Sequence, residues 1–272
     1  MSTDPAKLKA AATYNAAADH FDDEPLGFWA RIGRRTIERL ALPPGAAVLD
    51  VGCGTGASAL PAAERVGPRG RVIGVDLAER LLATARQKAE RHRLANIEFK
   101  SGDMERLGYP DDRFDAVVSV FSIFFVTDMV RQVRELWRMV RPGGSLAITT
   151  WGPRMFEPGT THWWNAVRKL RPDLVPEVSP WSRITEPEAV CQLLREAGIS
   201  AADVVAEPGR QILRSPDDWW TIVLGSGFRW TVDQLGPEAA EQVRSANLAE
   251  LRRARVDAIE TNAIFATARK PA

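Results

Sequence analysis

Residues 48–56 read Val48-Leu49-Asp50-Val51-Gly52-Cys53-Gly54-Thr55-Gly56, an aliphatic run that carries one acid and leads into glycines at every second position. The aliphatic residues are typical of a buried strand, and the alanine-rich residues 57–64 that follow are typical of a helix. Glycines in the connecting loop allow a ligand to lie against the backbone. The free N–H groups of a helix start favour a negatively charged ligand group. The pattern therefore predicts a nucleotide-type cofactor site.

Two cofactor fingerprints fit this loop. Gly52-x-Gly54-x-x-Ala57 matches the pattern of dinucleotide-binding proteins, and Asp76 follows it by about 20 residues, as that pattern expects. An NAD-type oxidoreductase is therefore one candidate. Three features favour a different cofactor: the acid Asp50 before the loop, the glycine alternation that continues to Gly56, and a third acidic position at Asp103.

Taken together, the motifs resemble those of the class I S-adenosylmethionine-dependent methyltransferases. In chain order they are Asp50-x-Gly52-x-Gly54-x-Gly56, Val75-Asp76-Leu77, Gly102-Asp103-Met104, Phe114-Asp115-Ala116-Val117-Val118 and Arg141-Pro142-Gly143-Gly144. The resemblance is strong over residues 46–152 and weak over residues 263–269. Within the family the chain is most similar to the branch of the ubiquinone and menaquinone C-methyltransferases, although the long tryptophan-rich region after Trp151 departs from them. The resemblance implies S-adenosyl-L-methionine as the cofactor.

Strand and helix signals alternate along the chain, which is typical of parallel β-α-β units. The near-continuous aliphatic strands suit a sheet that helices cover on both faces. We therefore expect an α/β fold with a doubly wound, mostly parallel seven-stranded sheet, the Rossmann-like methyltransferase fold, and a helical lid. The expected strands are residues 48–51, 71–76, 96–100, 114–120, 145–151 and 261–269.

The chain is expected to form a single methyltransferase domain with four regions. Residues 1–45 are an N-terminal helical lid segment, with helices over 6–21 and 26–42, and residues 46–152 are the cofactor-binding core. Residues 153–258 are a lid and substrate region that adds helices over 184–198 and 237–255, and residues 259–272 hold the final strand. Open α/β sheets bind ligands at the carboxyl ends of their strands, so we expect the lid to cover that edge.

The resemblance assigns cofactor contacts to the acids that end the second and third strands. Asp76, followed by Leu77, stands where family members bind both ribose hydroxyls. Asp103 stands where they bind the adenine amino group, and its neighbour Met104 where a side chain packs on the ring. A turn-forming aspartate in a Gly-Asp pair is the competing explanation of Asp103.

Further cofactor contacts are expected from the loop, the fourth strand and the N-terminal segment. Asp50 is expected to order the glycine loop and to lie near the cofactor's ammonium group. The segment from Ser119 to Ser122 is expected to face the sulfonium, although a plain core strand would have the same sequence. Tyr14 is a candidate cover over the cofactor, with an ordinary amphipathic helix as the alternative. The expected contacts in these segments are Gly52, Gly54, Gly56, Ser119, Val120, Phe121 and Tyr14.

The expected chemistry is in-line displacement at a methyl group that its positive sulfonium already activates. The protein then has to hold a nucleophile close to the methyl group and exclude water. A base is needed only if the nucleophile must lose a proton. His162 is the candidate base, with a packed lid residue beside two tryptophans as the competing interpretation. No metal site is expected, because the three histidines are scattered along the chain.

The expected acceptor is a small, partly hydrophobic or aromatic metabolite, methylated on O, N, S or C. The tryptophan pairs Trp163-Trp164 and Trp219-Trp220 are candidates for lining its pocket, or for joining the lid helices to the core. A nucleic-acid or protein methyltransferase is a rival interpretation, although the basic runs near residues 31–39 and 252–255 fit solvated helix faces. An NAD-type oxidoreductase, or an enzyme that keeps the cofactor but catalyses a rearrangement, would also fit the sequence.

Composition fits the methyltransferase interpretation. The formal net charge of +1 gives the chain no overall bias toward nucleic acid or membrane surfaces. Two cysteines, Cys53 and Cys191, do not form a disulfide framework, so a reducing, cytoplasmic setting is expected. The N-terminal residues do not resemble a signal peptide, and no apolar run has the length of a transmembrane helix.

Overall fold

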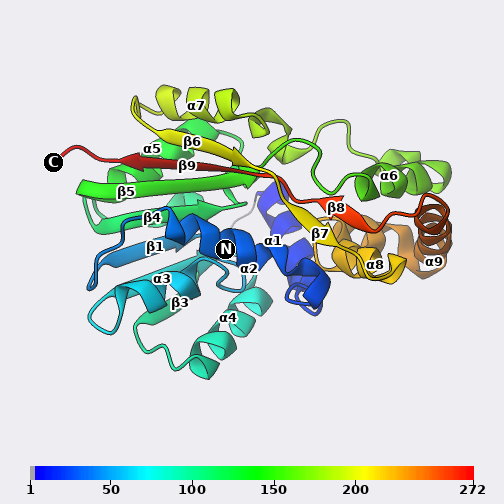
Figure 1. Cartoon of the computed structure of the whole chain (residues 1–272), viewed down its shortest axis with the longest axis horizontal. Helices are drawn as coiled ribbons and strands as arrows, with labels where there is room; N and C mark the ends of the chain where they lie inside the picture. The colour runs from blue at the N-terminus through cyan, green and yellow to red at the C-terminus, as the bar shows by residue number, and fades with distance from the viewer. Residues whose placement is uncertain (1–3) are drawn as a thin grey trace.

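The computed structural model describes residues 4–272 and contains the expected seven-stranded sheet, in the order β3-β2-β1-β4-β5-β9-β6 (Figure 1). The pairs β3-β2, β2-β1, β1-β4 and β4-β5 are parallel, whereas β9 runs antiparallel to both β5 and β6. The strands are β1 (Ala47–Val51), β2 (Arg71–Asp76), β3 (Ile97–Ser101), β4 (Phe114–Val120), β5 (Val140–Trp151), β6 (Asp203–Glu207) and β9 (Ala263–Arg269). The predicted mostly parallel, doubly wound sheet is confirmed.

Helices cover both faces of the sheet, which explains the uninterrupted aliphatic strands. Val48 belongs to the cluster that packs under α2, α3 and α4, while its neighbour Leu49 belongs to the cluster under α5 and α7. Because side chains alternate along a strand, a strand between two helical layers needs apolar residues at every position. The covering helices are α2 (Phe28–Glu38), α3 (Ala59–Val66), α4 (Glu79–Arg91), α5 (Met129–Met139) and α7 (Pro187–Glu196).

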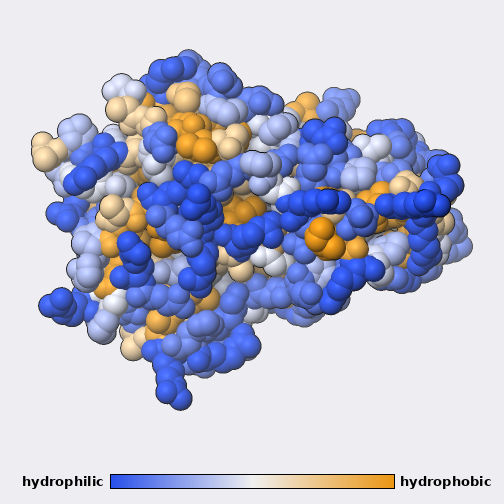
Figure 2. Space-filling model, viewed as in Figure 1, coloured by the Kyte–Doolittle hydropathy of each residue, from blue (hydrophilic) through white to orange (hydrophobic). Residues whose placement is uncertain are grey.

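The remaining elements gather at the carboxyl ends of the parallel strands, with α1 near the middle of Figure 1 and the others in its right-hand part. They are α1 (Pro5–Ala17), α6 (Gly159–Leu170), α8 (Pro216–Leu224), α9 (Arg229–Arg253) and a small sheet of β7 (Arg210–Ile212) with β8 (Ala258–Glu260). Single turns of 3-10 helix connect the larger elements: η1 (Glu24–Leu26), η2 (Met104–Arg106), η3 (Ile123–Phe125), η4 (Pro172–Leu174) and η5 (Pro180–Ile184). The face in Figure 2 is mostly hydrophilic over these elements.

One predicted helix end was wrong, because the helix expected over 6–21 ends at Ala17. The helix expected over 237–255 matches the second part of α9, because Gly236, with φ 74° and ψ 169°, interrupts the helical backbone just before Pro237. The strand expected over 261–269 is β9, and the short strand β8 before it pairs with β7 outside the main sheet. The edge strand β6 was not predicted. None of the helices within residues 4–272 combines the length and the hydropathy of a membrane span.

Candidate functional site

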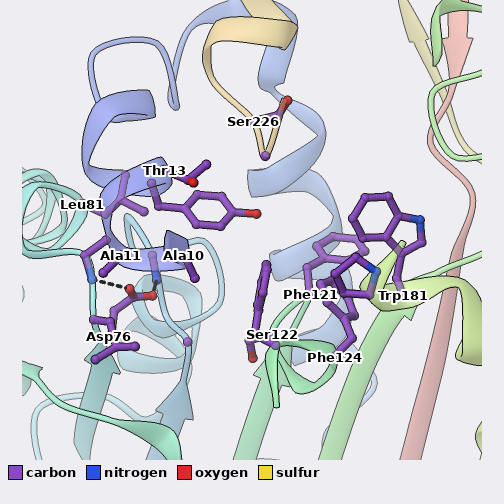
Figure 3. Close-up of a pocket in the computed structure, with 18 of the residues that line it drawn as sticks. Ala10, Ala11, Thr13, Asp76, Leu81, Phe121, Ser122, Phe124, Trp181 and Ser226 are labelled. Atoms are coloured by element: carbon purple, nitrogen blue, oxygen red, sulfur yellow. Dashed lines mark hydrogen bonds between the residues drawn. The ribbon is translucent and has the colours of Figure 1, made fainter. Parts of the chain in front are cut away.

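A cavity of about 560 Å³ opens at the carboxyl ends of the parallel strands, beneath α1 and the lid helices. Residues that end or follow three of these strands line it: Gly52 after β1, Asp76 at the end of β2 and Phe121 after β4. Figure 3 shows Asp76 and Leu81 on one side of this space, with Phe121, Phe124 and Trp181 on the other. The cavity therefore has a polar part at the glycine loop and an aromatic part away from it.

The glycine loop needs residues without side chains at two positions. Gly52 has a φ of 74°, and a Cβ atom there would overlap the side chain of Ser122. Gly54 has a φ of 51°, and its Cβ would stand 3.8 Å from Phe21 and 3.9 Å from Leu81, which also line the cavity. A side chain at position 54 would thus occupy ligand space rather than protein core. The third glycine of the motif, Gly56, does not line the cavity.

Asp76 ties the loop to the second strand. Its Oδ2 accepts a hydrogen bond of 2.8 Å from the Gly54 N–H and its Oδ1 one of 2.8 Å from the Ala78 N–H (Figure 3). Burial raises the pKa of this carboxyl, and the backbone N–H donors partly oppose the rise. Both Asp76 and the predicted contact Leu77 line the cavity. Asp76 thus presents a fixed carboxylate to any ligand in the polar part.

Asp50 lies behind the loop and outside the cavity lining. Its side chain is buried, and its Oδ2 accepts a 2.7 Å hydrogen bond from the Ser58 hydroxyl. Burial raises the pKa of Asp50 to about 7. Among the described residues its Oδ1 has no hydrogen-bond partner. A buried carboxylate oxygen without a donor is costly, and it fits a site that is completed by a cationic ligand group nearby.

Asp103 follows β3, as expected, and pairs with the N-terminal helix α1. Its Oδ2 lies 2.7 Å from the Nζ atom of Lys7 on α1, and its Oδ1 accepts a hydrogen bond of 3.0 Å from the Glu105 N–H. Burial acts to raise the pKa of Asp103, but the Lys7 and Glu105 hydrogen bonds outweigh it and the net pKa is lowered. Asp103 does not line the cavity, whereas its neighbour Met104 does. The structure thus brings Met104 to the cofactor side and pairs Asp103 with the N-terminal helix.

The segment after β4 is only partly at the cavity. Val120, Phe121 and Ser122 line it, but Ser119 is buried beneath them. The Ser122 hydroxyl donates to the Val51 carbonyl at 2.7 Å and lies 2.6 Å from the Ser119 hydroxyl, which must therefore be the donor of that second bond. These bonds clamp the ends of β1 and β4 together.

The N-terminal segment closes over the polar part. Tyr14 lines the cavity and packs edge-on against Phe21, with 6.1 Å between ring centroids, and against Phe125 at 5.6 Å. Burial raises the pKa of the Tyr14 phenol. The Asp22 carboxylate accepts a 2.8 Å hydrogen bond from the Thr55 hydroxyl of the glycine loop. This segment is therefore fastened directly to the loop that it covers.

His162 is placed away from the cavity. It lies on α6 but is absent from the lining, and its ring is in electrostatic range of Glu250 on α9. The neighbouring Trp164 is the residue of this pair that reaches the cavity, while Trp163 is fully buried beside it. The proposed role of His162 as a base has no geometric support, because its partly buried side chain does not line the cavity.

The aromatic part of the cavity was largely missed from the sequence. Its rings come from α2, β5, α6, η5, α9, the residues that flank these elements, and the turn that follows β4, whereas Trp219 and Trp220 of α8 do not line the cavity. A sequence signal existed for that turn, because its Phe-Phe pair follows the carboxyl end of a core strand. The other rings are brought in only by the tertiary packing. The aromatic and thioether side chains that line this part are Trp29, Phe124, Phe125, Trp151, Met155, Phe156, Trp164, Trp181, Phe228 and Trp230.

Comparisons with known proteins agree with this architecture. The family described as "Methyltransferase domain" matches residues 48–144. Nocamycin O-methyltransferase of Saccharothrix syringae is 32% identical over 254 residues, which cover 85% of this chain and 88% of that protein. Demethylmenaquinone methyltransferase of Listeria welshimeri is 37% identical over 134 residues, 49% of this chain and 56% of that protein.

A solved structure shares the fold beyond the core. The 4+2 cyclase SpnF is 26% identical, with a TM-score of 0.55, over 89% of this chain and 80% of that one. Three findings agree: the likeness to nocamycin O-methyltransferase over most of both chains, the match to the methyltransferase domain, and the glycine loop that Asp76 holds. The protein therefore belongs to the class I S-adenosylmethionine-dependent methyltransferases.

Proposed function

We propose that the protein transfers a methyl group from S-adenosyl-L-methionine to a small aromatic or partly hydrophobic metabolite. One observation carries this proposal: a single cavity joins the glycine loop and Asp76 to a compartment lined by aromatic rings. A cavity of about 560 Å³ has the size of a small-molecule site, which is mostly apolar with few polar groups. The methylation of small molecules named for two relatives supports the same class of acceptor.

The cofactor supplies a methyl group on a positively charged sulfur, which is already activated. The protein therefore needs to bind the cofactor, orient the acceptor and exclude water. We assign ribose binding to the Asp76 carboxylate and contact with the adenine ring to Met104. Asp50, whose Oδ1 lacks a partner among residues 4–272, is assigned to the ammonium group, directly or through water. Gly54 leaves the space in which the cofactor lies against the loop, and Tyr14 covers it.

We propose that aromatic side chains of the cavity exclude water from the reaction site. Phe121 stacks on Trp151 with 4.0 Å between ring centroids, and Phe21 stacks on Trp29 at 5.2 Å. All four of these residues line the cavity, so the stacked pairs place apolar rings around the proposed reaction site and exclude water from a reacting methyl group. Both cysteines are free, and we propose a reducing, cytoplasmic setting for the enzyme.

The test is transfer of a labelled methyl group to a panel of small aromatic acceptors. Catalytic transfer to one of them, with S-adenosylhomocysteine formed in equal amount, is the expected result. One of the similar solved structures is a cyclase, so a protein with this fold need not transfer a methyl group. Conversion of an acceptor without loss of the label from the cofactor would contradict the proposal.

A further inference from the structure

The charged residues that line the cavity are divided between its two ends. Asp76 is at the glycine loop, where the cofactor is proposed to bind, whereas Lys9 and Arg183 belong to the aromatic end. Within the described chain, the aromatic end is lined by no aspartate, glutamate or histidine. The compartment assigned to the acceptor therefore has a positive potential.

Lys9 lies on α1 with its ammonium group over an aromatic ring. Its Nζ atom is 3.4 Å from the centroid of the Trp230 ring on α9, and burial lowers the pKa of this lysine. Its neighbour on the same helix, Lys7, is paired with Asp103 and Glu105. Lys9 is exposed and has no such carboxylate partner anywhere in residues 4–272, so its ammonium group, beside Trp230, is available to pair with an anionic ligand.

Arg183 provides the second cation. It lies in η5, two residues after Trp181, is exposed, and lines both this cavity and a second pocket that Asp128 and Glu196 also line. Many arginines of this chain are held by carboxylates, as Arg171 is by Asp173 at 2.7 Å. Arg183 forms no ion pair within the part of the chain that the structure describes. A guanidinium that lines an aromatic pocket without an ion-pair partner is suited to a planar oxyanion.

We propose that the acceptor is an aromatic anion, such as an aryl carboxylate, an enolate or an acidic phenolate. Its ring would lie among the aromatic side chains of the compartment and its charge would face Lys9 and Arg183. This inference rests on the proposed function, which it narrows to one class of acceptor. An oxyanion has no proton to lose before it attacks a methyl group, so its methylation needs no general base. This agrees with the aromatic end of the cavity, where none of the described lining residues is a carboxylate or an imidazole.

The test measures binding with two fluorescent probes that differ in charge. Anilinonaphthalene sulfonate is an aromatic anion, and N-phenyl-naphthylamine has the same rings without the sulfonate. Both are titrated into protein saturated with S-adenosylhomocysteine. Lys9→Gln and Arg183→Gln are each expected to weaken the binding of the sulfonate by about two- to fivefold and to leave the binding of the neutral probe unchanged, as loss of one exposed charge contact implies.

Two exposed cations that do not line the cavity supply matched controls. Lys169→Gln on α6 and Arg91→Gln on α4 should leave the binding of both probes unchanged. Equal weakening of the two probes by Lys9→Gln and Arg183→Gln, or no weakening of either, would overturn the inference. Stabilisation of each variant by S-adenosylhomocysteine is recorded in a melting experiment. If that ligand fails to stabilise wild type, the proposed function fails, and the same titrations without it still decide the anion preference.

Discussion

Replacing Asp50 by asparagine is expected to stabilise the ligand-free protein at neutral pH while weakening its hold on the cofactor. Asp50 is 1% exposed, and one of its carboxylate oxygens has no partner among the described residues. Its pKa is raised from 3.8 to about 7. Since one pKa unit corresponds to about 1.36 kcal/mol, ionised Asp50 costs the folded state roughly 4 kcal/mol.

The pH dependence follows from the direction of this change. A carboxyl whose pKa is raised on folding binds more protons in the folded state, so its contribution to stability is complete below pH 3.8 and is lost as the pH rises to about 7. Between pH 5 and 7 the loss is about 1.36 kcal/mol per pH unit, or roughly 2 to 3 kcal/mol in all. Asparagine does not ionise, so Asp50→Asn escapes this loss.

Urea denaturation of both proteins at a series of pH values in this range measures the effect. The free energy of unfolding of Asp50→Asn minus that of wild type should grow by roughly 2 to 3 kcal/mol across it. Asp257→Asn is the control, because the Asp257 side chain is 80% exposed and stays in water in both states. A difference for Asp50→Asn that stays constant with pH would refute the argument. Calorimetry with S-adenosylhomocysteine should show weaker binding by the same variant.

Four further substitutions test the site. Asp76→Ala should abolish cofactor binding, and calorimetry with S-adenosylhomocysteine that returned wild-type affinity would contradict the ribose assignment. Gly54→Val should block binding in a folded protein, despite about 1–2 kcal/mol of strain at its left-handed φ; normal binding beside a native circular dichroism spectrum would disprove this. Gly52→Ala should lower the free energy of unfolding by about 2 kcal/mol or more, because its methyl group overlaps Ser122; an unchanged urea midpoint would argue otherwise. His162→Gln should leave kcat within about twofold, whereas a hundredfold loss would make His162 the base.

The central sheet could be predicted because its determinants are local. The strands β1 and β2 are mostly aliphatic, and a glycine follows the first while an acid ends the second. Residues 46–152 therefore specify the central strands and the edge of the sheet at which a ligand binds. The strand β6 was missed, because Asp203–Glu207 lies at the sheet edge with only partial burial and carries a weak signal. Such a strand is defined by its partner β9 rather than by its own residues.

The lid was harder to predict, because its helices are specified by contacts with one another. Trp219 is fully buried and donates its indole N–H to Asn247 at 2.7 Å, across 28 residues of chain. Nothing in the pattern around Trp219 reveals that partner. The helix expected over 237–255 could be predicted, by contrast, because Gly236 and Pro237 mark its start in the sequence.

The same limit applies to the site residues. Asp76 and the glycine loop are neighbours through adjoining strands, so their meeting follows from the sheet topology. The pairing of Asp103 with Lys7 joins residues 96 positions apart, and the distance of His162 from the cavity depends on how α6 packs on α9. Neither could be read from spacing along the chain.

The most direct test of the central claim is a crystal structure of the protein with S-adenosylhomocysteine. The account predicts the ribose hydroxyls on the Asp76 carboxylate and the sulfur atom directed toward the aromatic compartment beside Phe121. A complex in which the ligand lies outside this cavity, or in which protein side chains separate its sulfur from the aromatic rings, would contradict the account.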